Sequence, residues 1–543
     1  MFHLRKVRFL ALGATLVLIT AFVIGGAASA RTNASGTMTI ALAVLPGSLD
    51  TAHWEGQGSN EVWAALGLGE TLLRYKPVEA LVSPPKIPRM PAPTDLEGGL
   101  ASSWTQSPQG SITLKLRPAI SGYGNVLSAQ DVKWSYDRAA AIDPASQFNF
   151  ANASINVKNP ITVINSHTVR VNVTKYNPQT LVTLTSFFER IYDYSKVKQY
   201  ITSKDPWAQG WLGTHTADFG AWVSTSFTPN STLVLAANPH YWGGAPTIKG
   251  VIIKAVPDPG SRLQLIKSGS VDFTSYLNYD QYASLAGDKN VTRVSQPVFG
   301  TDTLSLDFGF KPFSNVLVRR AVSEAIDRAA IVQGVYKGFG TPATDQLPIT
   351  VPHPKLPVDP SFKYDPAAAK ALLAKAGYPN GFKFTLVVSP SRPGPYSGQI
   401  GVFLQSQLKK IGLDVTIQTI PGSADYQNTV STGKPDAFLY ESIIPWGDPG
   451  FFFNVWHNSV IHLQDYKGYV NPKFNKLAAL VDSVKPGAKR NSYISQADKI
   501  LDQDVAWVPL VEPLLPYVFS NKVNLSNFHT FELFINISDL SLN

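Results

Sequence analysis

Residues that could carry out catalysis are present in this sequence, but they are not spaced as a catalytic motif requires. His457 and His462 lie five positions apart, which is off the i, i+4 spacing of one helix face, and no glutamate stands between them. The sequence lacks a G-x-S-x-G nucleophile elbow, a Walker A loop and a dinucleotide fingerprint. Carboxylates are abundant but unpaired along the chain, so the acid and base of a glycosidase cannot be assigned. The pattern favours binding over catalysis, and we expect no enzymatic activity.

Metal and cofactor chemistry also lacks a signature in the sequence. The chain has no cysteine, which excludes disulfides, thiol catalysis and cysteine-ligated metals. No cluster of histidines points to a metal site. We therefore expect neither a metal nor another cofactor.

The composition describes a folded protein with more than one core. A chain of 543 residues is too long for a single core, so two or three lobes are expected. A hydrophobic content of 44% with 16% charged residues excludes wholesale disorder. The 11 Trp, 21 Tyr and 28 Phe exceed what cores need, and the surplus suits a pocket that stacks on a ligand.

The N-terminus predicts export. Arg5, Lys6 and Arg8 precede an apolar run over 9–24, and a small-x-small cleavage site ends at Ala30. We expect residues 1–30 to be a signal peptide cleaved after Ala30. The alternative is an uncleaved anchor, because 9–30 approaches the roughly 20 residues that span a bilayer.

Without the three basic residues of this leader, the net charge of +9 becomes 9 − 3 = +6. No basic tract follows in the rest of the chain, so nucleic acid is not an expected partner.

The elements that would position a binding site alternate between strands and helices, which is typical of an α/β protein. Ser128 and Asp131 have the spacing of a capping box, and Asp365, Pro366 and Gly377 mark the start and end of another helix. The remaining expected strands cover 37–44, 111–117, 163–173, 248–256, 383–388, 413–418 and 437–444, and the helices cover 60–73, 260–267, 398–411 and 491–503. The segments 507–511 and 517–519 close the chain.

One long amphipathic helix is expected over 315–335, because its apolar residues recur at helical spacing. Arg319, Arg320, Asp327 and Arg328 lie on this segment. We expect these four side chains to form ion pairs on the surface rather than to contact a ligand.

Several residue patterns follow one another in the order in which a known family carries them. They are E-x-L-x-x-Y at 70–75, a Trp-turn-strand-loop-helix segment at 98–139, N-P-x-Y-W at 238–242 followed by S-G-x-V-D at 268–272, R-x-A-x-x-x-A-I-D-R at 319–328 and Y-D-P-x-x-A-x-x-L-L-x-x-A-G at 364–377. On these residues the chain resembles the family 5 solute-binding proteins, the extracytoplasmic receptors of oligopeptide, dipeptide and nickel ABC importers. The resemblance spans about 37–525.

The resemblance implies an α/β fold of two lobes that close on a ligand by hinge motion. This is the periplasmic-binding-protein-like fold of type II, large cluster, with an extra subdomain inserted in lobe I. Carried onto this chain, lobe I comprises 31–57, 216–303 and 507–543, the inserted subdomain 58–215 and lobe II 304–506. The chain would cross between the lobes near Leu304 and Trp507.

The resemblance also implies that three segments meet at the ligand: the loop 45–50 with nearby Trp54, the turn 220–222, and the strand end 440–448. The turn departs from the family's G-T-G-P-[YF] pattern and keeps only an approximation of it. Arg392, in the loop 389–394, would meet a carboxylate by a bidentate pair. The candidate ligand-binding residues are Leu45, Pro46, Trp54, Trp222, Arg392, Tyr440, Glu441, Ser442, Trp446 and Asp448.

The chain departs from its peptide-binding relatives at the position of their anchoring carboxylate. Those relatives carry W-x-x-D before the D-P or E-P pair, and the Asp of that element pairs with the ammonium of the ligand. In this chain the position falls on Pro445, with Glu441 and Asp448 as the nearest acidic residues. The ligand therefore stays open between a peptide, a modified peptide, an oligosaccharide and another polar organic solute.

The function expected from the resemblance is capture of a peptide or similar polar solute outside the cytoplasmic membrane and delivery to an ABC permease. The protein is expected to act as a monomer, periplasmic or extracellular, and it cannot be a lipoprotein because it has no cysteine. Two alternatives remain: a secreted hydrolase of peptides or glycans, and a binding protein that reports its ligand to a sensory receptor.

Overall fold

A computed structural model describes residues 36–53, 62, 68–76, 91–432, 435–460, 468–528 and 535–543. The predicted leader, Trp54 and half of the helix expected over 60–73 lie outside the described residues. The end of that helix is wrong, because 68–72 are not helical and Leu73 begins the strand β2. No helix within the described ranges combines the length and the apolar character that crossing a bilayer requires.

A mixed sheet of twelve strands organises the described part of the chain. Its strands follow the order β16-β15-β17-β13-β18-β11-β1-β10-β9-β8, and β12 and β14 also pair with β18. Their bounds are β1 Thr37–Leu42, β8 Trp222–Thr228, β9 Thr232–Ala237, β10 Gly250–Ala255, β11 Phe273–Ser275, β12 Val291–Pro297, β13 Asp302–Leu306, β14 Gly340–Pro342, β15 Lys383–Val388, β16 Asp414–Thr419, β17 Ala437–Glu441 and β18 Val508–Ser520. β1, β13 and β17 read as almost unbroken buried runs because both faces of these central strands are covered.

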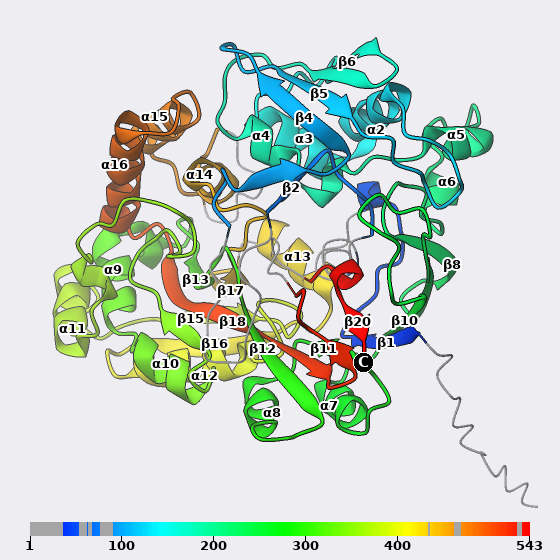
Figure 1. Cartoon of the computed structure of the whole chain (residues 1–543). Helices are drawn as coiled ribbons and strands as arrows, with labels where there is room; N and C mark the ends of the chain where they lie inside the picture. The colour runs from blue at the N-terminus through cyan, green and yellow to red at the C-terminus, as the bar shows by residue number, and fades with distance from the viewer. Residues whose placement is uncertain are drawn as a thin grey trace, which may run out of the picture. The chain divides into compact units, whose positions relative to one another are not determined.

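The strand β18 belongs to two parts of this sheet (Figure 1). Its first half pairs with β13 and β14, where Leu304 lies opposite Val508 and Gly340 opposite Pro513. Its second half pairs with β11 and β12, and Pro297 lies opposite Leu514. We call β1, β8–β12 and the second half of β18 the first sheet half, and β13–β17 and the first half of β18 the second sheet half.

The two closing segments 507–511 and 517–519 thus belong to one continuous strand. The sequence looked interrupted because Pro509, Pro513 and Pro516 cannot donate to a ladder. A register shift between Asp302 and Thr303 places the bulge of the ladder next to Pro509. The chain also passes between the sheet halves in the short segment from β12 to β13.

A second, four-stranded sheet lies between β3 and β8 in the chain and has the order β4-β5-β7-β6 (Figure 1). The strand expected over 163–173 is a hairpin of β6 and β7, because the polar residues 165–168 form its turn. The predicted capping box opens α2, where the Asp131 carboxylate accepts the Ser128 N–H at 2.7 Å. The bounds are β2 Leu73–Tyr75, β3 Leu96–Gly98, β4 Ala101–Gln106, β5 Ile112–Leu116, β6 Ile161–Asn165, β7 Thr168–Val171, α2 Ala129–Ile142, α3 Pro144–Asn152, α4 Thr180–Thr183, α5 Tyr194–Val197 and α6 Gln209–Leu212.

The later helices begin and end largely where the sequence places them. Asp365 caps α11 by accepting the Ala368 N–H at 2.8 Å, and Gly377 after this helix has a φ of +92°. The bounds are α7 Pro259–Lys267, α8 Tyr279–Ser284, α11 Pro366–Lys375, α12 Ser397–Lys409, α13 Ser423–Thr432, α14 Pro449–Trp456, α15 Pro472–Val481 and α16 Ala488–Asp504, and two short strands, β19 Val523–Asn524 and β20 Ser541–Leu542, pair near the C-terminus.

The single helix expected over 315–335 is wrong. The segment forms two helices, α9 Val316–Glu324 and α10 Arg328–Gly334. Asp327 separates them because its side chain accepts the Ala330 N–H at 2.9 Å and so caps α10. The apolar spacing continued across the break and hid it from the sequence pattern.

The expected surface position of Arg319 and Arg328 is also wrong. Both side chains are buried and donate to backbone carbonyls, Arg319 to Phe313 and Asp504 and Arg328 to Pro509. Carbonyls near the end of α16 and the start of β18 would otherwise be buried without donors.

Arg320, by contrast, forms the expected kind of ion pair, with Asp359 at 3.3 Å.

The two-helix arrangement predicts the sign of a simple substitution. Replacing Asp327 by Ala should lower the free energy of unfolding by about 1 kcal/mol, because the cap of α10 is lost. In one continuous helix the same change would stabilise, since Ala is the better helix former. Urea unfolding measures the difference, and Asp327→Asn, which caps equally well, is the matched control. A more stable Asp327→Ala variant would contradict the break.

Candidate functional site

Arg392, Tyr440 and Glu441 form one polar cluster at the end of β17. The Arg392 Nε donates to Glu441 Oε1 at 3.1 Å, and another nitrogen of the same guanidinium donates to the Tyr440 hydroxyl. The guanidinium also lies over the Tyr440 ring, 4.3 Å from its centroid. The side chains of Arg392 and Glu441 are 14% and 11% exposed, so both charges are mostly withdrawn from water while remaining reachable.

The cluster can bind two opposite charges. Burial raises the pKa of Glu441, and the adjacent Arg392 opposes that rise by favouring the carboxylate. A guanidinium presents a planar fork that matches a carboxylate, and a carboxylate accepts from an ammonium. This arrangement is suited to a small molecule that carries both groups.

A buried carboxyl group that the sequence analysis did not single out lies beside this cluster. Asp302, opposite Glu441 in the β13–β17 ladder, accepts hydrogen bonds from the hydroxyls of Tyr336 at 2.5 Å and Tyr396 at 3.1 Å. Burial raises its pKa to about 8, with the nearby Glu441 charge adding to the rise. Asp302 is therefore protonated at neutral pH, which avoids a second buried negative charge. Its partners are far apart in sequence, so no pattern could reveal it.

Ser442 ties the strand end to the connection between the sheet halves. Its backbone N–H donates to the Thr301 carbonyl at 2.9 Å, and its hydroxyl donates to the same oxygen at 3.1 Å. Its side chain is buried. In this structure Ser442 contributes to holding the connection between β12 and β13.

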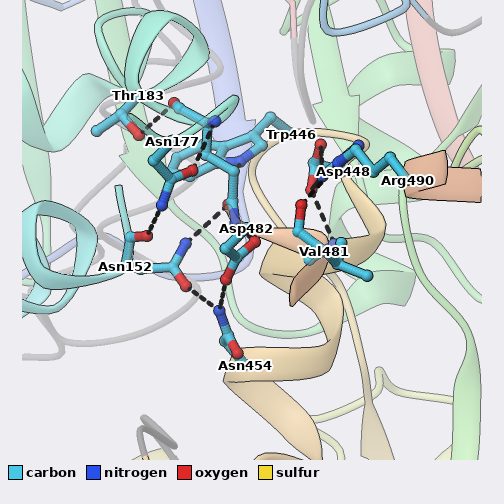
Figure 2. Close-up of polar contacts among 11 residues, drawn as sticks. Asn152, Asn177, Thr183, Trp446, Asp448, Asn454, Val481, Asp482 and Arg490 are labelled. Atoms are coloured by element: carbon cyan, nitrogen blue, oxygen red, sulfur yellow. Dashed lines mark hydrogen bonds and ion pairs between the residues drawn. The ribbon is translucent and has the colours of Figure 1, made fainter. Parts of the chain in front are cut away.

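We call 101–212, which holds the four-stranded sheet and the helices α2–α6, the small-sheet region. Trp446 lies in a buried polar network between this region and α14–α15 (Figure 2). Its ring is fully buried and packs on Phe451 with centroids 4.1 Å apart, while its Nε1 donates to Gln179 Oε1 at 3.4 Å. The Gln179 amide donates to Asp482 at 2.6 Å. Asn454 donates both to Asp482, at 2.5 Å, and to Asn152 Oδ1, at 2.6 Å. Five side chains from distant parts of the chain thus hydrogen-bond to one another.

Asp448 has two structural partners. It caps α14 by accepting the Gly450 N–H at 2.8 Å, and both of its oxygens accept from Arg490, each at 2.8 Å (Figure 2). Arg490 also donates to the Val481 carbonyl at 2.9 Å. Breaking such a buried pair on one side costs about 3–5 kcal/mol, so this pair holds α14 on α16.

The loop 45–50 is anchored by arginines of the small-sheet region. Asp50 forms a buried ion pair with Arg138 at 2.5 Å, and the Leu49 carbonyl accepts from Arg190 at 3.0 Å. Leu45 and Pro46 are buried in the same loop.

Trp222 opens β8 and is 1% exposed, packed in the core of the first sheet half. The two residues before it are held by Asn238, whose N–H donates to the Ala221 carbonyl at 2.8 Å and whose amide donates to that of Gly220 at 3.0 Å.

The structure therefore brings together three of the predicted ligand residues, Arg392, Tyr440 and Glu441, as one cluster. Ser442, Trp446 and Asp448 follow along the chain but are engaged with Thr301, Gln179 and Arg490. Leu45, Pro46 and Trp222 lie in the interior of the first sheet half, and Trp54 is outside the described residues. The ligand roles of all ten residues remain predictions.

Two of the sequence motifs meet in a structural clamp. Glu70 accepts from the Tyr241 hydroxyl at 2.7 Å and from Trp242 Nε1 at 3.0 Å. The Arg117 guanidinium stacks on the Trp242 ring, 3.8 Å from its centroid. Burial raises the pKa of Glu70, and Arg74 and the two donors counteract that rise.

A cavity of about 500 Å³ adjoins this clamp, lined by residues that include Glu70, Arg74, Arg190, Tyr241 and Asp539. None of the nine predicted ligand residues that the structure describes lines it.

The chain is similar in sequence to known solute-binding proteins of bacteria. Residues 95–461 match the model of the bacterial extracellular solute-binding proteins, family 5. The heme-binding protein A of Haemophilus influenzae is 25% identical over 453 residues, covering 78% of this chain and 81% of its own length. The glutathione-binding protein GsiB of Escherichia coli O6:K15:H31 is 27% identical over 449 residues, covering 80% and 83%.

Solved structures show the same fold. The periplasmic binding protein DppA of Helicobacter pylori, in complex with the peptide STSA, superposes with a TM-score of 0.79 at 22% identity, over 93% of this chain and 98% of its own. The dipeptide-binding protein of Pseudoalteromonas sp. SM9913, in complex with Met-Leu, gives 0.80 at 19% identity, over 93% and 100%. The predicted two-lobed α/β fold of periplasmic binding proteins is confirmed.

The buried network predicts a pH dependence of stability. Burial raises the pKa of Asp482 from 3.8 to about 7. Because the folded state binds this proton more tightly than the unfolded chain, the contribution to stability is full below about pH 4 and is lost as the pH rises to about 7. The Asp482→Asn variant has no carboxyl group to titrate at this position. Over this pH range its free energy of unfolding should therefore fall less steeply than that of the wild type, and the two slopes should differ by up to about 1.4 kcal/mol per pH unit.

Urea unfolding between pH 4.5 and 7.5 measures both curves. The matched control is Asp414→Asn, whose carboxylate is 63% exposed in an ion pair with Lys383 and whose curve should follow the wild type. If the free energy of unfolding of Asp482→Asn fell with pH as steeply as that of the wild type, Asp482 would not be the group that titrates.

Proposed function

Because this chain belongs to the family 5 bacterial extracellular solute-binding proteins, we propose that it captures a peptide-like zwitterionic solute and delivers it to the permease of an ABC importer. Members of the family bind solutes for transport, and this substrate-binding role is that of the chain. The observation that carries the proposal is the family match over 95–461, which includes both Arg392 and Glu441.

The ligand chemistry follows from the Arg392–Glu441 cluster. The carboxylate of a zwitterionic ligand would displace Glu441 from the Arg392 guanidinium. The ammonium of the same ligand would then bind the Glu441 carboxylate. Glu441 thereby replaces the aspartate that peptide-binding relatives carry at the position of Pro445. Both groups are mostly desolvated already, so each new charge-assisted bond would gain more than at an exposed site.

Lobe closure supplies the mechanism. The contacts of Asn152 and Gln179 with Asn454 and Asp482 join the region assigned to the inserted subdomain with the region assigned to lobe II. We infer that these contacts form on closure. A ligand that binds only the closed form shifts the equilibrium by its differential affinity for that form.

The remaining parts of the proposal concern the setting of the protein. It works outside the cytoplasmic membrane after export, meets its permease as a monomer, and leaves its ligand chemically unchanged. The glutathione-binding and peptide-bound relatives support a peptide-like ligand. The heme-binding relative is named for a different kind of ligand, so heme is the main alternative to test.

Native mass spectrometry of freshly purified protein tests capture, because closed receptors retain their ligand. The expected result is a bound molecule below about 1 kDa that carries both an ammonium and a carboxylate. Small-angle scattering should show a more compact particle with that ligand. If the ligand were found cleaved or otherwise modified after incubation, the protein would be an enzyme, and the proposal of capture alone would be wrong.

The cluster gives a direct mutational prediction. Arg392→Met and Glu441→Gln should each weaken binding of the retained ligand at least tenfold, about 1.4 kcal/mol, because truncation leaves the opposite charge of the ligand buried and unpaired. Titration calorimetry with glutathione, Ser-Thr-Ser-Ala and heme as further probes measures the effect. Lys383→Met is the control, since Lys383 forms an exposed pair with Asp414 on β15–β16. Unchanged affinity in both variants would show that the ligand does not bind at Arg392 and Glu441.

A further inference from the structure

Three side chains converge around one point between α16 and the loop that follows β14. They are Asp345 and His353 of the loop and Asp498 of α16, and one ligand atom of each lies within 4.8 Å of the others. Two donors of a tetrahedral zinc ion lie about 3.4 Å apart, at bonds of about 2.1 Å. Small rotations of these side chains would therefore place all three atoms on one ion.

Asp498 is the observation that points to a cation. Its residue is 0% exposed, and no hydrogen-bond donor among the described residues reaches either of its carboxylate oxygens. A carboxylate buried without a donor is costly, so Asp498 must share a proton with the neighbouring Asp345, pair with a cation or coordinate a metal. One turn later on α16, Asp502 is 5% exposed, and its Oδ1 also has no donor within the described ranges.

His353 is oriented as a metal ligand. Its Nδ1 lies 2.6 Å from the Val351 carbonyl, and this carbonyl can only accept, so Nδ1 carries the proton. In the neutral ring, Nε2 then presents a lone pair, 3.4 Å from Asp345 Oδ2. Two groups so placed need a cation between them, either a second ring proton that makes His353 an imidazolium paired with Asp345 or a metal ion. A backbone carbonyl behind the imidazole is a common way in which proteins orient a metal-ligating histidine.

From this geometry we propose that Asp345, His353 and Asp498 bind one divalent transition-metal ion, with Asp502 as a further oxygen donor. One imidazole with several carboxylates suits Zn²⁺ and its neighbours, whereas Ca²⁺ prefers oxygen ligands alone. The ion would neutralise the buried carboxylates and fasten the loop to α16.

The position of the loop gives the ion a structural role. The Ile349 N–H donates to Glu512 of β18 at 3.0 Å, and Thr350 donates to the Val298 carbonyl at 2.7 Å, just before the chain enters β13. The loop thus contacts both places where the chain passes between the sheet halves. Because the ligands all lie in the region assigned to lobe II, the ion is resident in the protein and is not the transported solute.

Titration calorimetry on the full chain, stripped with EDTA and returned to metal-free buffer, tests the site with ZnCl₂. The expected result is one equivalent bound, with a rise in Tm of about 3 °C at a hundredfold excess over Kd. Asp498→Asn should lose this binding, and His353→Gln should weaken it at least tenfold. His167→Gln, which removes an exposed histidine of the small sheet, is the matched control and should bind like the wild type.

Two outcomes would overturn the proposal. One is the absence of binding up to 100 µM Zn²⁺ (about −5.5 kcal/mol), which would leave Asp345 and Asp498 as a pair that shares a proton. The other is binding that Asp498→Asn and His353→Gln leave unchanged. Tighter binding of CaCl₂ than of ZnCl₂ would contradict the class of ion.

A measurement on the wild type alone keeps the test valid if a variant fails to fold. X-ray absorption of the zinc-loaded protein should show one imidazole and otherwise oxygen ligands. A shell with two or more imidazoles would contradict the site. Asp498→Asn should also leave solute affinity unchanged, which separates a failure of this proposal from a failure of the proposed function.

Discussion

The pairing of β18 with strands of both sheet halves is the constraint on which the rest of the structure depends. Its thirteen residues complete the ladder of β13 at one end and that of β12 at the other. The segment between β12 and β13 runs beside it and is held by Ser442. Arg319 and Arg328 supply donors to carbonyls around the start of this strand. Because the hydrogen bonds of β18 fix its register against both sheet halves, the halves can move relative to each other only by bending β18 and the segment between β12 and β13.

Buried charge is compensated in a different way at each place where the chain needs it. Asp448 has a full counter-ion in Arg490, Glu70 has two neutral donors, and Asp302 keeps its proton with the help of burial. Among these four described groups, the Arg392–Glu441 pair leaves its two charges the most accessible. This difference separates groups that hold the fold from a pair that solvent can reach, and it is the reason for which we propose that the solute binds at the end of β17.

Local signals in the sequence predicted most elements but not their long-range partners. The caps at Ser128 and Asp365 and the strand Lys383–Val388 were legible because they depend on neighbours within a few residues. The break at Asp327 was hidden because apolar spacing continued through it. For the site, Glu441 and Arg392 were identified as separate candidates, but their contact depends on tertiary packing. The environment of Asp302 and the meeting of Glu70 with Trp242 likewise join residues that no spacing connects.

The position of β18 near the end of the chain has a consequence for biosynthesis. Neither half of the main sheet can finish its hydrogen bonding until residues beyond 508 have left the ribosome, although most of the other strands are made long before. Contacts of such large sequence separation slow folding, because loop-closure entropy is spent before they form. A nascent chain of this protein thus stays incompletely folded until β18 has been made, and an incompletely folded chain is what a secretion channel can thread.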